Sequence, residues 1–174
     1  MDYGRGTGAR ATKRRLWMIL SLAATLAIAV TIFCFSAQEA EDSSRLSDAL
    51  TRVITTLFRT SKPEVGQPKL SKTLVTVVRK TAHMAEFGLL AVSLSLFLYS
   101  LRPEGDIKRT SGLAWLISVA YGVTDELHQL FVAGREGKLI DVCIDAVGAA
   151  LGALLIALTM AAWRKRRTQR TDER

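Results

Sequence analysis

The apolar residues of this chain gather into four runs, each long enough for a helix to cross a lipid bilayer. The runs cover residues 16–35, 82–101, 111–130 and 140–163. The first carries no charged residue, whereas the other three carry polar residues near one end. A helix rises about 1.5 Å per residue, so roughly 20 residues cross about 30 Å of hydrocarbon. The pattern therefore predicts an all-α fold, a membrane bundle of four transmembrane helices.

The long segment between the first and second runs has the periodicity of an amphipathic helix. Apolar side chains recur at helical spacing at Leu46, Leu50, Val53, Ile54, Leu57 and Phe58. On the opposite side, arginines follow at seven-residue intervals at Arg45, Arg52 and Arg59. The pattern predicts an amphipathic helix in the external segment between helices 1 and 2. This helix either lies in the outer membrane interface or packs its apolar face on the bundle.

The net charge of +8 first suggests nucleic acid as a partner, but the positions of the basic residues favour another explanation. Of the 24 Lys and Arg residues, 14 lie in three segments that precede the first run, join the second to the third, and follow the fourth. With four spans these segments share one side of the membrane, which the positive-inside rule makes cytoplasmic. We therefore expect a multi-pass protein of the cytoplasmic (inner) membrane, with both termini cytoplasmic and no nucleic-acid partner.

The same charge pattern divides the chain into three parts. Residues 1–15 form a basic cytoplasmic N-terminus, residues 16–163 the membrane domain, and residues 164–174 a basic cytoplasmic tail. A cleaved signal peptide is the alternative for the N-terminal part. The first run has about twenty residues, however, and the apolar region of a signal peptide has about 7–15. We expect this run to stay in place as an anchor.

Many ionisable residues lie in or beside the last three runs, although charged side chains are costly in membrane helices and usually face the bundle interior. They are Arg79, Lys80, His83 and Glu86 at the second run, Asp125, Glu126, His128 and the polar Gln129 at the third, Arg135 in the following loop, and Asp141 and Asp145 at the fourth. The second and fourth helices enter the membrane from outside, and the third returns to the outside. All these residues are therefore predicted to meet at the outer end of the bundle.

Two pairs of small residues add detail to this picture. Gly148 and Gly152 form a G-x-x-x-G step, which lets a neighbouring helix approach closely just below Asp145. Cys34 and Cys143 fall near the outer ends of two spans. A disulfide between them is conceivable, and a role as small apolar filler is the simpler interpretation.

Four stretches of the chain carry distinctive polar motifs. They read F-S-A-Q-E-A-E-D-S-S-R-L-S at 35–47, R-K-T-A-H-M-A-E-F at 79–87, Y-G-V-T-D-E-L-H-Q-L-F-V-A-G-R at 121–135 and D-V-C-I-D-A-V-G-A-A-L-G at 141–152. Their combination resembles the VanZ-like family of small bacterial multi-pass membrane proteins. Founding members of that family are associated with low-level resistance to teicoplanin, so the resemblance implies an effect on glycopeptide antibiotic susceptibility. It supplies no established reaction.

The leading hypothesis is a membrane module that recognises a cell-envelope component at the outer face of the cytoplasmic membrane. Arg79 and Arg135 would hold a phosphate or carboxylate as bidentate forks, and Gln129 with the aspartates would hydrogen-bond hydroxyl groups. The candidate binding residues are Arg79, Lys80, Glu126, Gln129, Arg135, Asp141 and Asp145. Membrane lipids or lipid-linked envelope precursors are the expected partners.

Three other functions stay open. A membrane-embedded enzyme would act on a lipid-linked substrate through a histidine as general base and a carboxylate that orients it, with His83, Glu86, Asp125 and His128 as candidate catalytic residues. A proton- or ion-coupled transporter would use the same groups as a relay. A purely structural ion-pair network would bind nothing. No cofactor is predicted; histidines beside carboxylates leave a divalent metal as an alternative, without a tight spacing motif to support it.

Overall fold

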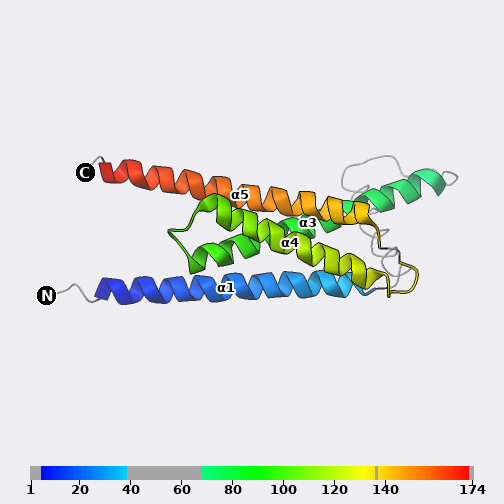
Figure 1. Ribbon diagram of the computed structural model, residues 1–174, viewed down its shortest axis with the longest axis horizontal. Helices are drawn as coiled ribbons and strands as arrows, with labels where there is room; N and C mark the ends of the chain where they lie inside the picture. The colour runs from blue at the N-terminus through cyan, green and yellow to red at the C-terminus, as the bar shows by residue number, and fades with distance from the viewer. Residues whose placement is uncertain (1–4, 39–67, 136, 173–174) are drawn as a thin grey trace.

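The computed structural model describes residues 5–38, 68–135 and 137–172, and every regular element within them is an α-helix. The helices are α1 (Arg5–Ser36), α3 (Pro68–Leu101), α4 (Ile107–Gln129) and α5 (Leu139–Asp172). They run antiparallel in this order, so that both chain termini lie at the same end of the bundle (Figure 1). Helix α3 contacts each of the other three. The predicted all-α fold is confirmed.

Three of these helices are long and apolar enough to cross a membrane. The qualifying segments are Ala11–Ser36 of α1, Thr76–Leu101 of α3 and Leu139–Thr171 of α5, each longer than the run predicted there. Helix α4 does not qualify by composition, because polar side chains such as Asp125 and Glu126 interrupt its apolar run. The predicted amphipathic helix within 39–67 lies outside the described residues.

Helices α3 and α5 approach each other closely at two glycines of α5. A Cβ atom on Gly148 would lie 2.0 Å from the carbonyl oxygen of Met84, and one on Gly152 would lie 2.1 Å from that of Gly88. Only glycine permits backbones to come this close, as the G-x-x-x-G spacing predicted. Around this contact the core contains the buried apolar residues Ile32, Phe87, Leu90, Ala91, Ala149 and Ala153.

The outward faces of all four helices carry large exposed apolar side chains. Examples are Leu20, Leu26 and Val30 on α1, Leu89 and Leu96 on α3, Leu116 and Leu127 on α4, and Leu151, Leu155 and Leu158 on α5. A protein in water rarely exposes so continuous an apolar surface, whereas a helix bundle in lipid requires it.

At the end of the bundle that holds the termini, arginine side chains cover carbonyl groups at helix ends. Arg14 donates from Nε to the carbonyl of Ser100 and from Nη2 to that of Leu101, both at 3.1 Å, at the C-terminus of α3. Arg164 of α5 donates to the carbonyls of Pro103 (2.7 Å) and Gly105 (2.8 Å) in the α3–α4 loop. These contacts satisfy carbonyl groups that the helices themselves leave without donors.

Candidate functional site

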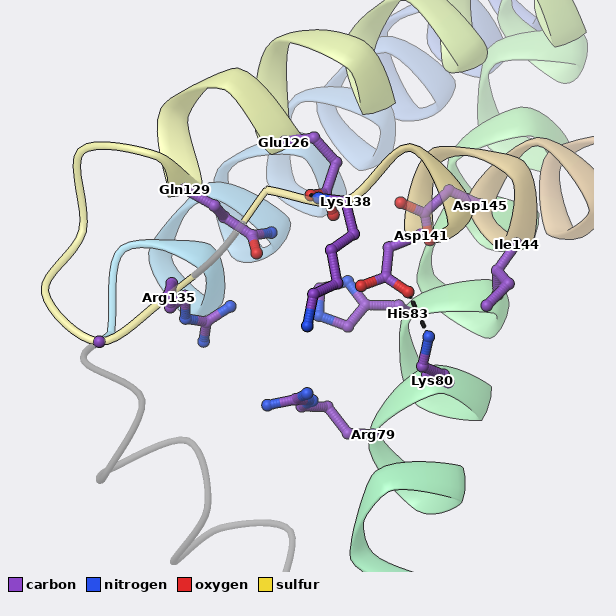
Figure 2. A pocket seen from close by; sticks show the side chains of 11 residues that line it. Arg79, Lys80, His83, Glu126, Gln129, Arg135, Lys138, Asp141, Ile144 and Asp145 are labelled. Atoms are coloured by element: carbon purple, nitrogen blue, oxygen red, sulfur yellow. Dashed lines mark hydrogen bonds and ion pairs between the residues drawn. The ribbon is translucent and has the colours of Figure 1, made fainter. Parts of the chain in front are cut away.

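A polar cavity of about 130 Å³ lies at the opposite end of the bundle from the termini. It is formed where α3, α4, the α4–α5 loop and α5 meet, and we call it the polar cavity. Its lining residues are Arg79, Lys80, His83, Glu126, Gln129, Gly134, Arg135, Lys138, Asp141, Ile144 and Asp145 (Figure 2). Eight of the eleven residues predicted for the site thus line one cavity, as the directions of the helices required.

Three basic side chains point toward the same space in this cavity. Figure 2 shows the charged ends of Arg79, Arg135 and Lys138 converging from α3 and from the α4–α5 loop. Within the part of the chain that the structure describes, the Arg79 side chain has no hydrogen-bond or ion-pair partner. This side of the cavity therefore presents positive charge to whatever enters it.

Arg135 is held in place by the end of helix α1. Its Nε donates to the carbonyl of Gln38 and its Nη2 to the carbonyl of Phe35, each at 2.9 Å. Burial lowers the pKa of the Arg135 guanidinium, and the nearby charge of Arg79 lowers it further. An arginine keeps its proton through such changes because its ordinary pKa is so high. Two nitrogens of the Arg135 guanidinium, which was predicted to bind a ligand, thus hold the C-terminus of α1. The rest of the guanidinium faces the cavity.

The opposite wall of the cavity is acidic, and two of its carboxylates have partners. Lys80 of α3 forms an ion pair with Asp141 in the first turn of α5. A carboxylate at this position also interacts favourably with the helix dipole. Glu126 of α4 accepts a hydrogen bond of 2.8 Å at Oε2 from the backbone N–H of Lys138. Asp145 is buried, and its Oδ1 has no partner among the described atoms.

The sharp loop between α4 and α5 depends on two glycines. Gly134 adopts a positive φ of 73°, a region that residues with side chains rarely occupy. A Cβ atom on Gly137 would lie 2.6 Å from the carbonyl oxygen of Glu126. The loop therefore turns tightly enough to bring Arg135 and Lys138 over the same cavity.

Beside the cavity, a buried network joins α1 to α4. Ser36 donates from Oγ to Oδ2 of Asp125 at 2.6 Å, and Gln129 donates from Nε2 to the same oxygen at 3.0 Å. All three residues are buried, but only Gln129 also lines the cavity. Sequence reasoning did not place Ser36 in the site, although it begins the polar motif after the first run. The network fixes the rotation of α4 against α1.

The four candidate catalytic residues do not converge. His83 lines the cavity, but its Nδ1 lies 3.9 Å from Oε2 of Glu86, too far for a hydrogen bond, and Glu86 does not line the cavity. His128 stacks on Phe33 of α1 with ring centroids 4.7 Å apart, and Asp125 belongs to the buried network. Of the four candidate catalytic residues, only His83 therefore lines the polar cavity, where Glu126, Asp141 and Asp145 supply the carboxylates.

The described residues contain no group of three or more His, Cys, Asp or Glu arranged to hold a metal ion. Cys34 and Cys143 are both free and exposed, so the conceivable disulfide between them is not formed. Lys138, Gly134 and Ile144 complete the lining without having been predicted as site residues. Lys138 lies in a loop, where helical periodicity gives no direction for a side chain.

An all-helical bundle with apolar outer faces, three helices able to span a bilayer and an ionisable cluster at one end defines a multi-pass membrane protein. The VanZ/LLP1 family model matches residues 21–160, which include every described residue of the cavity. The chain therefore belongs to the VanZ/LLP1 family, and the resemblance found in its sequence motifs is confirmed. No curated protein and no solved structure matches the chain.

Proposed function

We propose that this protein binds the anionic headgroup of a lipid or lipid-linked envelope component at the outer face of the cytoplasmic membrane. The observation that carries the proposal is the convergence of Arg79, Arg135 and Lys138 on one cavity at the end of the bundle. Guanidinium groups match the geometry of phosphate and carboxylate oxygens. An anion in the cavity would compensate the positive charge that Arg79 brings there, while the acidic wall and Gln129 would hydrogen-bond hydroxyl groups of a sugar or glycerol.

In this proposal α4 is the fourth transmembrane helix. Its 23 residues would extend about 34 Å, enough to cross the hydrocarbon, and it runs alongside the other three. Its polar residues Ser111, Ser118, Asp125, Glu126 and Gln129 are buried. Its exposed face is apolar, with Leu113, Leu116, Val123 and Leu127. Polar side chains turned inward are the arrangement expected of a membrane helix whose neighbours satisfy them.

Four spans place both termini on one side of the membrane. The basic residues at that end, among them Arg14, Arg164 and the tail that follows, support a cytoplasmic location. Residues 1–15 and 164–174 are then cytoplasmic flanks of the membrane domain 16–163. The polar cavity at the opposite end opens at the depth of the outer lipid headgroups, where an envelope lipid is accessible without leaving its leaflet.

The test compares lipid binding by Arg79→Ala and wild-type protein, with dioleoyl phosphatidic acid as the anionic probe and native mass spectrometry as the readout. Loss of a charge-assisted contact should weaken binding about tenfold or more. Arg166→Ala is the matched control, because it removes an exposed arginine from the opposite end of the bundle. If folded Arg79→Ala protein retains phosphatidic acid as well as the control does, the proposed site is wrong.

The proposal extends to glycopeptide susceptibility, because the resemblance of the sequence motifs to VanZ-like proteins implies such an effect. Cells that express the wild-type chain should then tolerate more teicoplanin than cells that express Arg79→Ala at the same level. If teicoplanin inhibits both kinds of cell at the same concentration, the lipid site has no role in susceptibility to the antibiotic.

A further inference from the structure

A second hollow lies on the outer surface of the bundle between α4 and α5. It has a volume of about 200 Å³, and its lining is almost entirely apolar. We call it the apolar groove. Its apolar lining residues are Val123 and Leu127 from α4, Leu130 and Gly137 from the α4–α5 loop, and Leu139 and Val142 from α5. Leu127, Leu130 and Leu139 are more than half exposed, so the groove is open toward the surrounding hydrocarbon.

The apolar groove and the polar cavity share a wall. Glu126 and Lys138 line both hollows, and the hydrogen bond of 2.8 Å from the Lys138 backbone N–H to Glu126 Oε2 holds that wall together. The polar cavity lies on one side of this contact with its basic side chains, and the apolar groove lies on the other. A molecule that extends from the polar cavity into the apolar groove would therefore contact charged side chains at one end and apolar side chains at the other.

A charged cavity beside an apolar groove matches the chemistry of a single amphiphilic molecule. The proposed function places an anionic headgroup in the polar cavity, and in a membrane lipid such as phosphatidic acid a short glycerol unit joins the headgroup to the acyl chains. The leucine and valine side chains that make up most of the groove offer a soluble metabolite no donor or acceptor, but they offer close packing for methylene groups. In the proposed topology this end of the bundle lies where the helices leave the membrane, the depth at which acyl chains begin.

We infer that the apolar groove holds the first part of the acyl chain of the same lipid whose headgroup binds in the polar cavity. The inference rests on the proposed function and names its ligand class: an intact anionic lipid rather than a free headgroup. The groove contributes packing and orientation, because an acyl chain that moves from the bilayer into it gains no hydrophobic free energy. The acyl chain stays in its leaflet, and the headgroup reaches past Glu126 and Lys138 into the polar cavity.

The inference predicts that filling the groove weakens lipid binding without affecting the headgroup site. Val142→Trp places a bulky apolar side chain in the groove from α5, and Val123→Trp does so from α4. Val147→Trp is the matched control, since Val147 is exposed on α5 but does not line the groove. In phosphatidylcholine nanodiscs we expect both groove variants to bind dioleoyl phosphatidic acid on the order of fivefold more weakly than the control.

A second probe, sn-glycerol 3-phosphate, carries the headgroup without a chain. Its binding should be equal in the groove variants and the control, which also shows that the variants are folded. A phosphatidic acid with a diazirine near the carbonyl end of its acyl chain should cross-link to residues of the apolar groove in wild-type protein.

The outcomes separate the two proposals. If the groove variants bind phosphatidic acid like the control and the cross-links fall elsewhere, while Arg79→Ala still loses binding, the inference is overturned and the headgroup site stands. If Arg79→Ala also binds normally, the proposed function fails. If the groove variants lose glycerol phosphate together with the lipid, the groove acts only through the shape of the cavity, and the acyl-chain assignment is overturned.

Discussion

The contact between α3 and α5 leaves no room for a side chain at Gly152. Alanine at this position would bring its Cβ to 2.1 Å from the carbonyl oxygen of Gly88 and to 3.1 Å from the Cα of the same residue. Ordinary Cβ contacts begin at 3.4 Å. The obstructing atoms belong to the backbone and cannot rotate away, so the two helices have to separate by roughly 1 Å before a methyl group fits.

The size of the effect follows from two opposing contributions. Forcing an extra methyl group into a packed interface costs about 1–3 kcal/mol. Alanine is a better helix former than glycine, which returns up to about 1 kcal/mol. We expect Gly152→Ala to lower the free energy of unfolding by about 1–2 kcal/mol. This change reduces the ratio of folded to unfolded protein about five- to thirtyfold.

The assay is thermal unfolding in a single detergent, followed by circular dichroism, with Gly112→Ala as the matched control. Gly112 also lies within a helix, but nothing lies within 4 Å of a Cβ built on it. The control should unfold at the wild-type temperature or slightly above it, and Gly152→Ala well below. Equal midpoints for the two variants would refute the close approach of α3 and α5.

Two further substitutions test contacts around the polar cavity. Arg135→Ala removes the two hydrogen bonds to the carbonyls of Phe35 and Gln38 and should cost about 1–3 kcal/mol of stability in thermal unfolding. Arg135→Lys should recover only part of this, because an ammonium group cannot reproduce the fork; full recovery would contradict the assigned geometry. Lys80→Ala should destabilise by about 0.5–1 kcal/mol, since the ion pair with Asp141 is partly exposed. A double-mutant cycle with Asp141→Asn that shows no coupling would rule this ion pair out.

Much of the fold follows from the sequence pattern. The apolar runs locate four helices, and the order of the runs determines which helix ends meet, so the pattern alone predicts that Arg79, Gln129 and Asp145 lie together. The G-x-x-x-G step identifies the close helix contact but not the partner, which is α3. Composition alone does not identify α4 as a membrane span. The polar residues on its buried face make this helix less apolar overall than its neighbours.

The details of the site depend on how the helices rotate about their axes. Helical periodicity gives the face on which Asp125 and His128 lie, but it does not say which neighbour that face meets. In the structure it meets α1, where Ser36 and Phe33 contact them, so these two residues are withdrawn from the cavity. The positions of loop side chains such as Lys138 depend on turn geometry, which helical periodicity does not describe.

The contacts at the end of α1 impose an order on the assembly of this protein. The carbonyl of Phe35 is hydrogen-bonded by Arg135, which lies 100 residues later in the chain, and Ser36 donates to Asp125, which lies 89 residues later. Helix α1 therefore leaves the ribosome long before the side chains that fix its far end have been synthesised. Its contacts with α3 involve residues made earlier, so the far end of α1 is the part that is fixed last. The polar cavity is complete only when Asp145, the last of its lining residues in the chain, has been made.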